Sequence, residues 1–169
     1  VFHERLGLHV TIDNDSRSMA YGEFMNGVIK DEKNIFFINV SWGLGMGVIV
    51  DGKLYYGKSG FSGEFGHIPV FDNEIICHCG KKGCLETEAS GSYIYRRFLE
   101  KIAEGNSSIL DQRVKNSEKV TLEDILEAAL NDDMLAIELV EEVGNNLGKQ
   151  IAGLINLFNP ELVVVGGSL

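Results

Sequence analysis

One stretch decides the fold of this chain: residues 63–86, which read GEFGHIPVFDNEIICHCGKKGCLE. It gathers all three cysteines of the chain, Cys77, Cys79 and Cys84, and places them after His67. One imidazole and three potential thiolates form the Cys3His ligand set that tetrahedral structural zinc prefers. The sequence therefore predicts a structural zinc site whose ligands are His67, Cys77, Cys79 and Cys84.

The glycines of the same stretch support a loop that folds around a small ion. Gly80 and Gly83 lie between the last two cysteines, where the chain must double back and a β-carbon would resist the backbone angles. Two alternatives stay open. The cysteines can be buried thiols beside an unrelated histidine, because free cysteine often packs as a small hydrophobe. His78 also competes with His67 as the fourth ligand.

Four groups of motifs follow one another along the chain. They are IDND at residues 12–15, WGLGMG at residues 42–47, the GEFGH and CHCGKKGCLE motifs at residues 63–67 and 77–86, and NLFNPE with VVVGG at residues 156–161 and 163–167. In this order they resemble the sugar and catalytic motif, the second phosphate loop, the zinc signature and the adenosine-side segment of the ROK family. That family comprises repressors, uncharacterised reading frames and sugar kinases.

The resemblance implies an α/β fold of the actin-like, ribonuclease H-like ATPase type with two lobes. Residues 1–33 then end the N-terminal lobe, and residues 34–169 form an incomplete C-terminal lobe with a zinc loop at residues 67–84. Relatives carry an Asp-x-Gly-x-Thr phosphate motif before the segment that matches residues 8–15, and further chain after the paired glycines. We therefore expect the sequence to be an internal piece of a longer protein.

Composition limits the partners of the chain. The formal net charge of −10 argues against nucleic-acid binding by this segment, because phosphate contacts need clustered lysine and arginine. Any contact with DNA is expected from a helix-turn-helix module elsewhere. The chain shows no apolar run of the roughly 20 residues that a membrane span needs. An odd number of cysteines with metal-like spacing favours a reducing compartment, so we expect a cytoplasmic protein without membrane contact.

Apolar patterns predict the elements around these motifs. The predicted strands are residues 8–12, 35–40, 46–50, 53–56 and 162–165. Asp51-Gly52 is a strong two-residue turn signal, so residues 35–56 are expected to form a β-meander whose first turn carries the glycine-rich loop. The last strand is expected to be buried and to stop at Gly166-Gly167.

Helical spacing predicts four helices. The first covers residues 15–28, with Met19, Ala20 and Phe24 on one side, and the second carries Ile94, Phe98, Leu99 and Ile102 on one face and is expected to stop at Gly105. The third is opened by a capping box at residues 121–124. The fourth covers residues 132–158, where the apolar positions with helical spacing are Ile137, Val140, Leu147, Ile151, Leu154, Ile155 and Phe158. The polar residues 30–34 suggest a boundary between lobes.

By the family resemblance, the sugar-contacting residues are Asn14, Asp15, Glu64, His67 and Glu86. Short carboxylates and amides suit a hexose, because its ring of hydroxyls both donates and accepts hydrogen bonds. His67 would then hold zinc and also face the sugar. Taken singly, the residues at 13–15 can be only a turn and a helix cap. Glu64 and Glu86 can be solvated surface acids.

The second phosphate loop departs from the kinase pattern that the resemblance implies. Kinases of the family usually have Gly-Thr-Gly there, and this chain has Gly43-Leu44-Gly45, in which leucine cannot donate a hydrogen bond to phosphate. Gly43, Gly45 and Gly47 are weak evidence for a nucleotide, because glycines also serve tight turns. Ser16-Arg17 is a second departure, since kinases usually continue the Asn-Asp motif with Ala-Asn.

Both departures favour a sugar-sensing regulator in which the cleft binds a sugar or sugar phosphate and a DNA-binding module elsewhere responds. The alternative is an ATP-dependent sugar kinase, with Asp15 as catalytic base and magnesium and ATP held at the glycine loops. A third hypothesis is a mainly structural role, in which the helix at residues 132–158 pairs with a second copy. We expect a homo-oligomer.

Overall fold

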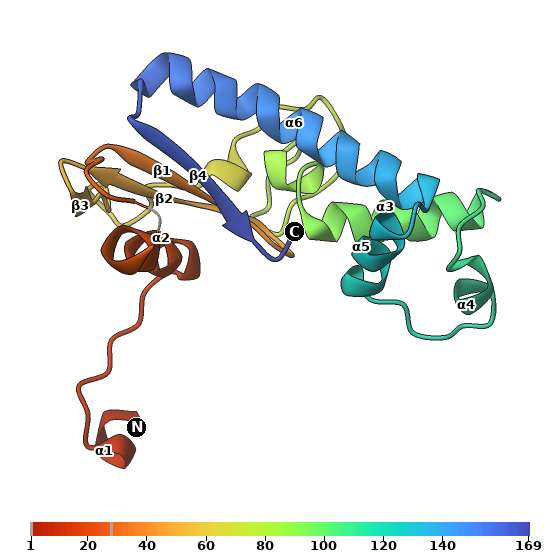
Figure 1. Ribbon diagram of the computed structural model, residues 1–169, viewed down its shortest axis with the longest axis horizontal. Coiled ribbons are helices and arrows are strands. Elements are labelled where there is room, and N and C mark those ends of the chain that lie inside the picture. Colours follow the sequence, from red (N-terminus) through yellow and green to blue (C-terminus); the bar gives the residue numbers. More distant parts are fainter. Residues whose placement is uncertain (1, 28) are drawn as a thin grey trace.

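The computed structural model describes residues 2–27 and 29–169 (Figure 1). A sheet lies between two helices, and a group of further helices lies beyond one end of it. The elements are α1 (Phe2–Leu6), α2 (Asp15–Asn26), β1 (Ile35–Val40), β2 (Leu44–Val50), β3 (Lys53–Leu54), the 3-10 turns η1 (Phe65–His67) and η2 (Leu85–Thr87), α3 (Gly91–Ala103), α4 (Asp111–Lys115), α5 (Leu122–Leu130), α6 (Met134–Phe158) and β4 (Leu162–Gly167).

Three strands form an antiparallel meander, and a fourth strand joins its edge. The strand order is β3-β2-β1-β4, with β1 antiparallel to β2 and parallel to β4. Asp51 and Gly52 connect β2 to β3 with φ values of 51° and 73°, and positive φ at both positions is what a type I′ hairpin turn needs. The predicted meander is therefore confirmed.

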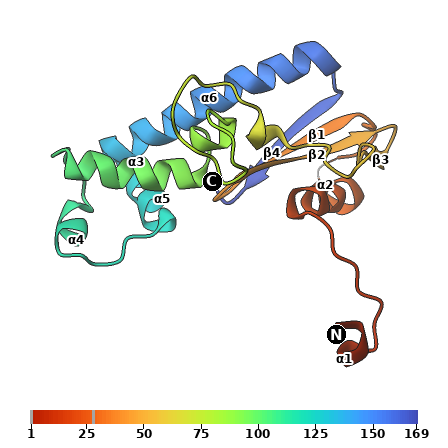
Figure 2. The same cartoon turned by 180° about the vertical axis from the view of Figure 1, so that it is seen from behind.

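Helices cover both faces of the sheet, as Figures 1 and 2 show. On one face, Leu147 and Leu154 of α6 join Phe36, Ile38 and Val48 in a shared apolar cluster. Full burial of each such side chain stabilises the fold by about 1.5–3 kcal/mol relative to its exposure. α2 lies on the opposite face. The layers are thus helix, sheet, helix.

Glycines let α2 approach β2 closely. A β-carbon on Gly47 would lie 2.3 Å from the Cβ of Ala20, and one on Gly45 would lie 2.1 Å from the Oγ of Ser16. Both distances are far below van der Waals contact, so a larger residue at either position would push the helix away. Gly45 and Gly47 therefore belong to the packing of β2 against α2 and lie outside the turn.

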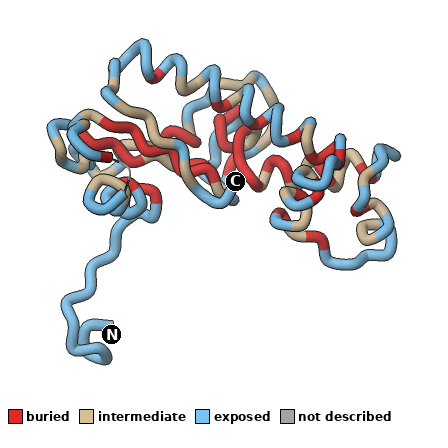
Figure 3. Tube along the Cα trace, in the orientation of Figure 1, coloured by how far each residue is buried: buried red, intermediate tan, exposed pale blue. Residues whose placement is uncertain are grey.

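A second apolar core joins α3, α5 and the first half of α6, and Figure 3 shows its buried stretches. Ile94, Phe98 and Ile102 project from one face of α3 into this core, where they meet Ile125 of α5. The predicted face of this helix is confirmed. Gly105 follows the end of α3 with a φ of 97°, as a residue that stops a helix commonly does.

The helices α5 and α6 both begin with side-chain caps. Thr121 accepts a hydrogen bond from the N–H of Asp124 at 3.2 Å, and the Asp124 carboxylate accepts the Thr121 N–H at 2.7 Å. The predicted capping box is confirmed. Asp133 is 4% exposed and accepts the N–H groups of Ala136 and Ile109 at 2.9 and 2.7 Å. One buried carboxylate thus caps α6 and anchors the loop between α3 and α4.

Four predicted strands differ from the observed ones, and one of them is β4, which continues through Gly166 and Gly167 instead of stopping before them. The strand predicted at residues 8–12 is absent, and Ile12 is 93% exposed, because no described strand lies beside this segment to pair with its backbone. β2 begins at Leu44 rather than at Met46, and β3 ends at Leu54. The predicted end of the first long helix, Val28, lies outside the described residues.

The two halves of α6 bury their apolar residues against different parts of the molecule. Its first half buries Leu135 and Leu139 against α3 and α5, and its second half buries Leu147 and Leu154. Among the apolar residues whose spacing predicted this helix, Val140, Ile155 and Phe158 are 36%, 44% and 64% exposed. The two halves pack against different neighbours, so one straight stripe does not describe the buried residues.

β4 is less buried than the sequence predicts. Val165 is 57% exposed, because β4 forms an edge of the described sheet. The division between residues 1–33 and residues 34–169 stays a prediction, and α2 from the first part packs on the sheet of the second. Among the described residues, no helix combines the length and the apolar character that crossing a bilayer requires.

Candidate functional site

A polar cavity of about 230 Å³ lies where the start of α2 meets the β1–β2 turn and the two ends of the cysteine loop. Its lining residues are Asn14, Asp15, Ser16, Asn39, Ser41, Gly43, Leu44, Gly45, Met46, Ser62, Gly63, Glu64, His67, His78 and Glu86. All five residues predicted to contact a sugar are among them. Folding thus brings side chains from distant parts of the sequence to one concave site.

The start of α2 supplies two of these residues. Asn14 is the N-cap of the helix, and its side-chain oxygen accepts the N–H of Arg17 at 3.1 Å. Asp15 accepts the N–H of Ser16 at 2.7 Å through one carboxylate oxygen. The helix-cap interpretation therefore holds for Asn14. Capping leaves the amide NH2 of Asn14 and the second oxygen of Asp15 for a ligand.

Glu86 is a buried acid held at the β1–β2 turn. Its side chain accepts the backbone N–H of Leu44 at 2.9 Å through Oε2, and its Oε1 lies 3.0 Å from Nδ1 of His78. Gly43 makes room for the carboxylate, because a β-carbon there would lie 2.8 Å from Oε2. The residue is 9% exposed, so the surface-acid interpretation is wrong for Glu86.

His67 stands between the cavity and the cysteines. Its Nε2 lies 3.7 Å from Oε2 of Glu64, whose side chain is 45% exposed. Its Nδ1 lies 3.5 Å from Sγ of Cys77. One ring nitrogen therefore faces the cavity side and the other faces the thiols, as a residue that serves both sites requires.

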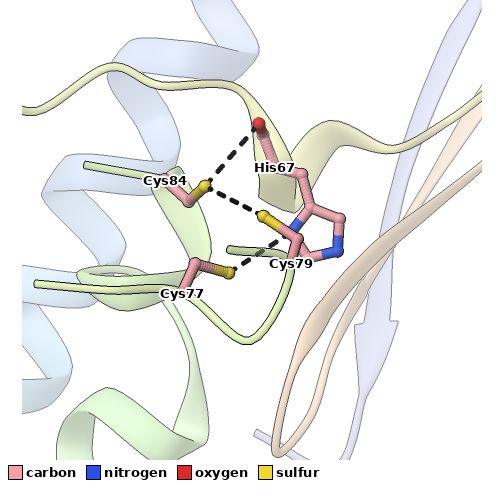
Figure 4. A group of neighbouring side chains, drawn as sticks. All are labelled: His67, Cys77, Cys79 and Cys84. Atoms are coloured by element: carbon pink, nitrogen blue, oxygen red, sulfur yellow. Dashed lines mark hydrogen bonds between the residues drawn. The ribbon is translucent and has the colours of Figure 1, made fainter. Parts of the chain in front are cut away.

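Figure 4 shows the cysteine cluster. The ligand atoms of His67, Cys77, Cys79 and Cys84 all lie within 4.8 Å of one another. Sγ of Cys79 and Sγ of Cys84 are 3.6 Å apart. Tetrahedral zinc, with bonds of about 2.3 Å to sulfur and about 2.0–2.1 Å to nitrogen, places its ligand atoms roughly 3.5–3.8 Å apart. The donor set and its spacing fit a zinc ion.

The loop that carries the thiols has the backbone that the sequence predicts. Gly80 and Gly83 have φ values of 87° and 68°, and a β-carbon on Gly83 would lie 1.9 Å from the carbonyl oxygen of Phe71. The N–H of Cys77 donates to the carbonyl of Lys81 at 2.8 Å and closes the turn. Glycine is thus required at position 83 for both conformation and space.

The surroundings of the three thiols shift their pKa values in different directions. Burial raises the pKa of Cys84 to about 12 and also raises the pKa of Cys77. A hydrogen bond from the backbone N–H of Lys81 lowers the pKa of Cys79. Buried thiolates need a compensating positive charge, and a divalent cation at the cluster would supply it while displacing the protons.

His78 lies outside the cluster of four. Its Nδ1 pairs with Glu86 at 3.0 Å, its side chain is 72% exposed, and its ring meets that of His67 edge to face with centroids 4.9 Å apart. Its Nδ1 is 3.9 Å from Sγ of Cys77. The geometry therefore favours His67 over His78 as the fourth ligand.

The turn between β1 and β2 differs from the expected phosphate loop. It is formed by residues 41–43, and Leu44 already belongs to β2, where its side chain is buried in the sheet core. That Leu44 stands where kinases of the family have threonine stays a prediction. The exposed side chain of the turn is Trp42, which packs on Tyr95 with ring centroids 5.6 Å apart and carries no hydroxyl.

Sequence reasoning did not place Asn39 in the cavity, nor its hydrogen-bond partners Ser16 and Ser41. Asn39 is 5% exposed, donates to Oγ of Ser16 at 3.1 Å and accepts from Oγ of Ser41 at 2.9 Å. One signal was available, because Asn39 interrupts the apolar strand IFFINV and a buried amide needs hydrogen-bond partners. Its partners come from α2 and from the turn, which the strand pattern does not reveal.

The fold and the site together define a mixed α/β protein whose polar cavity lies beside a Cys3His cluster. The chain belongs to the ROK family, which matches residues 1–169. It is 39% identical over 166 residues to the DNA-binding transcriptional dual regulator NagC of Escherichia coli strain K12, an alignment that covers 98% of this chain and 40% of that protein.

A kinase is nearly as similar. The chain is 36% identical over 167 residues to a glucokinase of Halalkalibacterium halodurans, covering 98% of this chain and 51% of that protein. The structure superposes with a TM-score of 0.86 on a ROK family glucokinase from Streptomyces griseus in complex with glucose and AMPPNP, at 32% identity, covering 98% of this chain and 54% of that one.

These matches settle the family and the α/β class. The predicted ROK resemblance is confirmed, and the fold neighbours are sugar kinases of the actin-like type. The chain spans about half or less of the length of the relatives it matches. Regulators and kinases both stand among its close relatives, so the activity of the whole protein is a matter for proposal.

Proposed function

We propose that this chain is the ligand-binding part of a sugar-responsive ROK transcriptional regulator and that its polar cavity binds a sugar or sugar phosphate. One observation carries the proposal. Amide, carboxylate and imidazole side chains from the start of α2, from η1 and the loop before it, and from η2 converge on a single cavity beside the cysteine cluster.

The chemistry of the cavity suits a polyhydroxylated ring. Asp15, Glu64 and Glu86 supply carboxylate oxygens that accept hydrogen bonds from sugar hydroxyls. The amide of Asn14 and the Nε2 of His67 donate to hydroxyl oxygens. Because Glu86 is already fixed by the Leu44 N–H, its carboxylate is positioned before a ligand arrives.

Zinc has a structural role in this proposal. The ion would be held by His67, Cys77, Cys79 and Cys84. It would supply positive charge that stabilises the thiolates and would take no part in a reaction. The ion would fix the imidazole of His67 through Nδ1 and leave Nε2 toward the cavity. Loss of the ion is then expected to weaken sugar binding indirectly.

Two features favour a regulator over a kinase. Leu44, which by the family resemblance stands where kinases usually have threonine, has no hydroxyl for a phosphate oxygen, and its N–H is donated to Glu86. Regulation would require that the ligand prefer one arrangement of lobes or subunits. A helix-turn-helix module outside this segment would read DNA, and a homo-oligomer would present two such modules.

One specific observation supports the kinase alternative: Asp15 is exposed and its carboxylate lines the cavity. In that mechanism Asp15 would accept the proton of the attacking sugar hydroxyl, and ATP with magnesium would lie at the β1–β2 turn, which ends at Gly43. Of Gly43, Gly45 and Gly47, the first two line the cavity and Gly47 does not.

One experiment separates the two functions. The full-length protein is tested for ATP turnover with glucose, N-acetylglucosamine and their 6-phosphates, and for release of its operator DNA by the same compounds. We expect operator release by at least one compound without turnover above background. Sugar phosphorylation that disappears in Asp15→Asn would overturn the regulator and establish the kinase.

A further inference from the structure

Arg17 joins two segments that both carry residues of the cavity. Its Nε donates to Oδ1 of Asp13 at 3.1 Å, and its Nη1 donates to the carbonyl oxygen of Gly60 at 2.6 Å. The side chain is only 13% exposed although it lies at the surface start of α2. The guanidinium thus ties the segment before α2 to the loop that follows β3.

Tyr56 closes the same network from the other side. Its hydroxyl donates to Oδ2 of Asp13 at 3.0 Å, and its ring lies 5.3 Å from the guanidinium carbon of Arg17. Hydrogen bonds, first from the N–H of Asn14 and next from the Tyr56 hydroxyl, lower the pKa of Asp13. Asp13 therefore stays ionised and receives Arg17 and Tyr56 on separate oxygens.

The loop that this network holds has an unusual backbone. Gly57, Gly60 and Gly63 have φ values of 68°, 82° and 86°, and a glycine-rich loop loses much conformational entropy when it is ordered. Its end carries Ser62, Gly63 and Glu64, which line the cavity. Fixing Gly60 therefore restricts the position of Glu64.

We infer that Asp13, Arg17 and Tyr56 form a latch that holds the loop at residues 57–63 against the start of α2 and thereby sets the affinity of the cavity for its ligand. This inference rests on the proposed function. None of the three latch residues lines the cavity, so they are positioning residues. A loop that is ordered before binding does not have to be ordered by the ligand, and affinity rises accordingly.

The test uses Arg17→Gln and Tyr56→Phe in the full-length protein. Tyr56→Phe removes one hydroxyl and keeps the ring, and Lys58→Gln is the control because it removes an exposed cation from the same loop. Amide hydrogen exchange is measured without ligand, and calorimetry measures binding of glucose, N-acetylglucosamine and their 6-phosphates. We expect faster exchange at residues 57–64 and about tenfold weaker binding in Arg17→Gln, equivalent to about 1.4 kcal/mol, with a smaller effect in Tyr56→Phe.

Each outcome decides one question. Unchanged exchange at residues 57–64 in Arg17→Gln overturns the latch, and so does faster exchange with unchanged affinity. If amide hydrogen exchange in Arg17→Gln also becomes faster in β1 and β2, the substitution destabilises the whole fold, and the proposal that it acts locally on the loop is overturned. A wild-type protein that binds neither sugar nor either 6-phosphate overturns the proposed function, and the exchange measurement then decides the latch as a structural device alone.

Discussion

Two glutamates of the cavity have different surroundings and therefore different tasks. Glu86 is buried and accepts a backbone N–H, so it shapes the turn as well as the cavity. The side chain of Glu64 is 45% exposed and its carboxylate lies 3.7 Å from His67. Removing the charge of Glu64 thus removes a ligand contact without leaving a buried group unpaired.

Glu64→Gln is expected to weaken sugar binding by about tenfold or more, because hydrogen bonds to charged groups contribute about 1.5–3 kcal/mol. The melting temperature should stay close to that of the wild type. Calorimetry with the sugar that releases the operator measures the first quantity, and calorimetric melting measures the second. Glu138→Gln, an exposed acid on α6, is the control, and an unchanged affinity in Glu64→Gln would remove Glu64 from the site.

At the scale of elements, α5 depends on its first turn. Asp124 accepts the Thr121 N–H and forms an ion pair with Arg113 at 3.0 Å, and these partners, Arg113 first, lower its pKa from 3.8 to about 2. A carboxyl whose pKa is lowered by folding contributes stability above its unfolded pKa. That contribution is lost as the pH falls from about 4 toward about 2.

Asp124→Asn is therefore expected to destabilise the protein by about 1 kcal/mol at pH 7, the usual size of a lost helix cap. The difference from the wild type should shrink below about pH 4, because there the carboxyl of the unfolded chain binds a proton while that of the folded protein, with a pKa of about 2, is still largely ionised. Urea unfolding at pH 7 and pH 3 measures both values, with Glu127→Gln on the exposed side of α5 as the control. A difference that persists unchanged at pH 3 would contradict the ionic origin.

At the scale of the whole molecule, the cysteine loop connects the sheet to the helical core. The loop begins at η1, which packs against β2, and it ends at η2, which leads into α3. His67 and Glu86 at its two ends both line the cavity. Loss of the cysteine cluster is therefore expected to affect both the stability of the fold and ligand binding in the cavity.

Cys79→Ser is expected to lose bound zinc and much of the stability, because structural zinc contributes about 10–16 kcal/mol of apparent binding free energy in zinc-finger peptides. Elemental analysis should find one zinc per wild-type chain, and a chelator should lower the wild-type melting temperature. His78→Ala is the matched control and should keep its zinc. A Cys79→Ser protein that melts like the wild type would refute the structural role.

Local patterns in the sequence were sufficient for several parts of the fold. The meander, the Asp51-Gly52 turn, the apolar face of α3 and the capping box of α5 were predicted, because each depends on residues near one another in the chain. The cluster of His67 with the three cysteines was predicted for a related reason, since ligand type and spacing restrict a metal loop strongly.

Only the tertiary structure decided how these parts meet. It placed Trp42 rather than Leu44 at the turn, fixed Glu86 by the Leu44 N–H, and turned the buried face of α6 between two cores. It also left residues 8–12 without a strand partner and brought Arg17 to Gly60. Composition and periodicity report which residues avoid water, whereas long-range hydrogen bonds and strand neighbours depend on the packing of distant segments, which a single sequence does not encode locally.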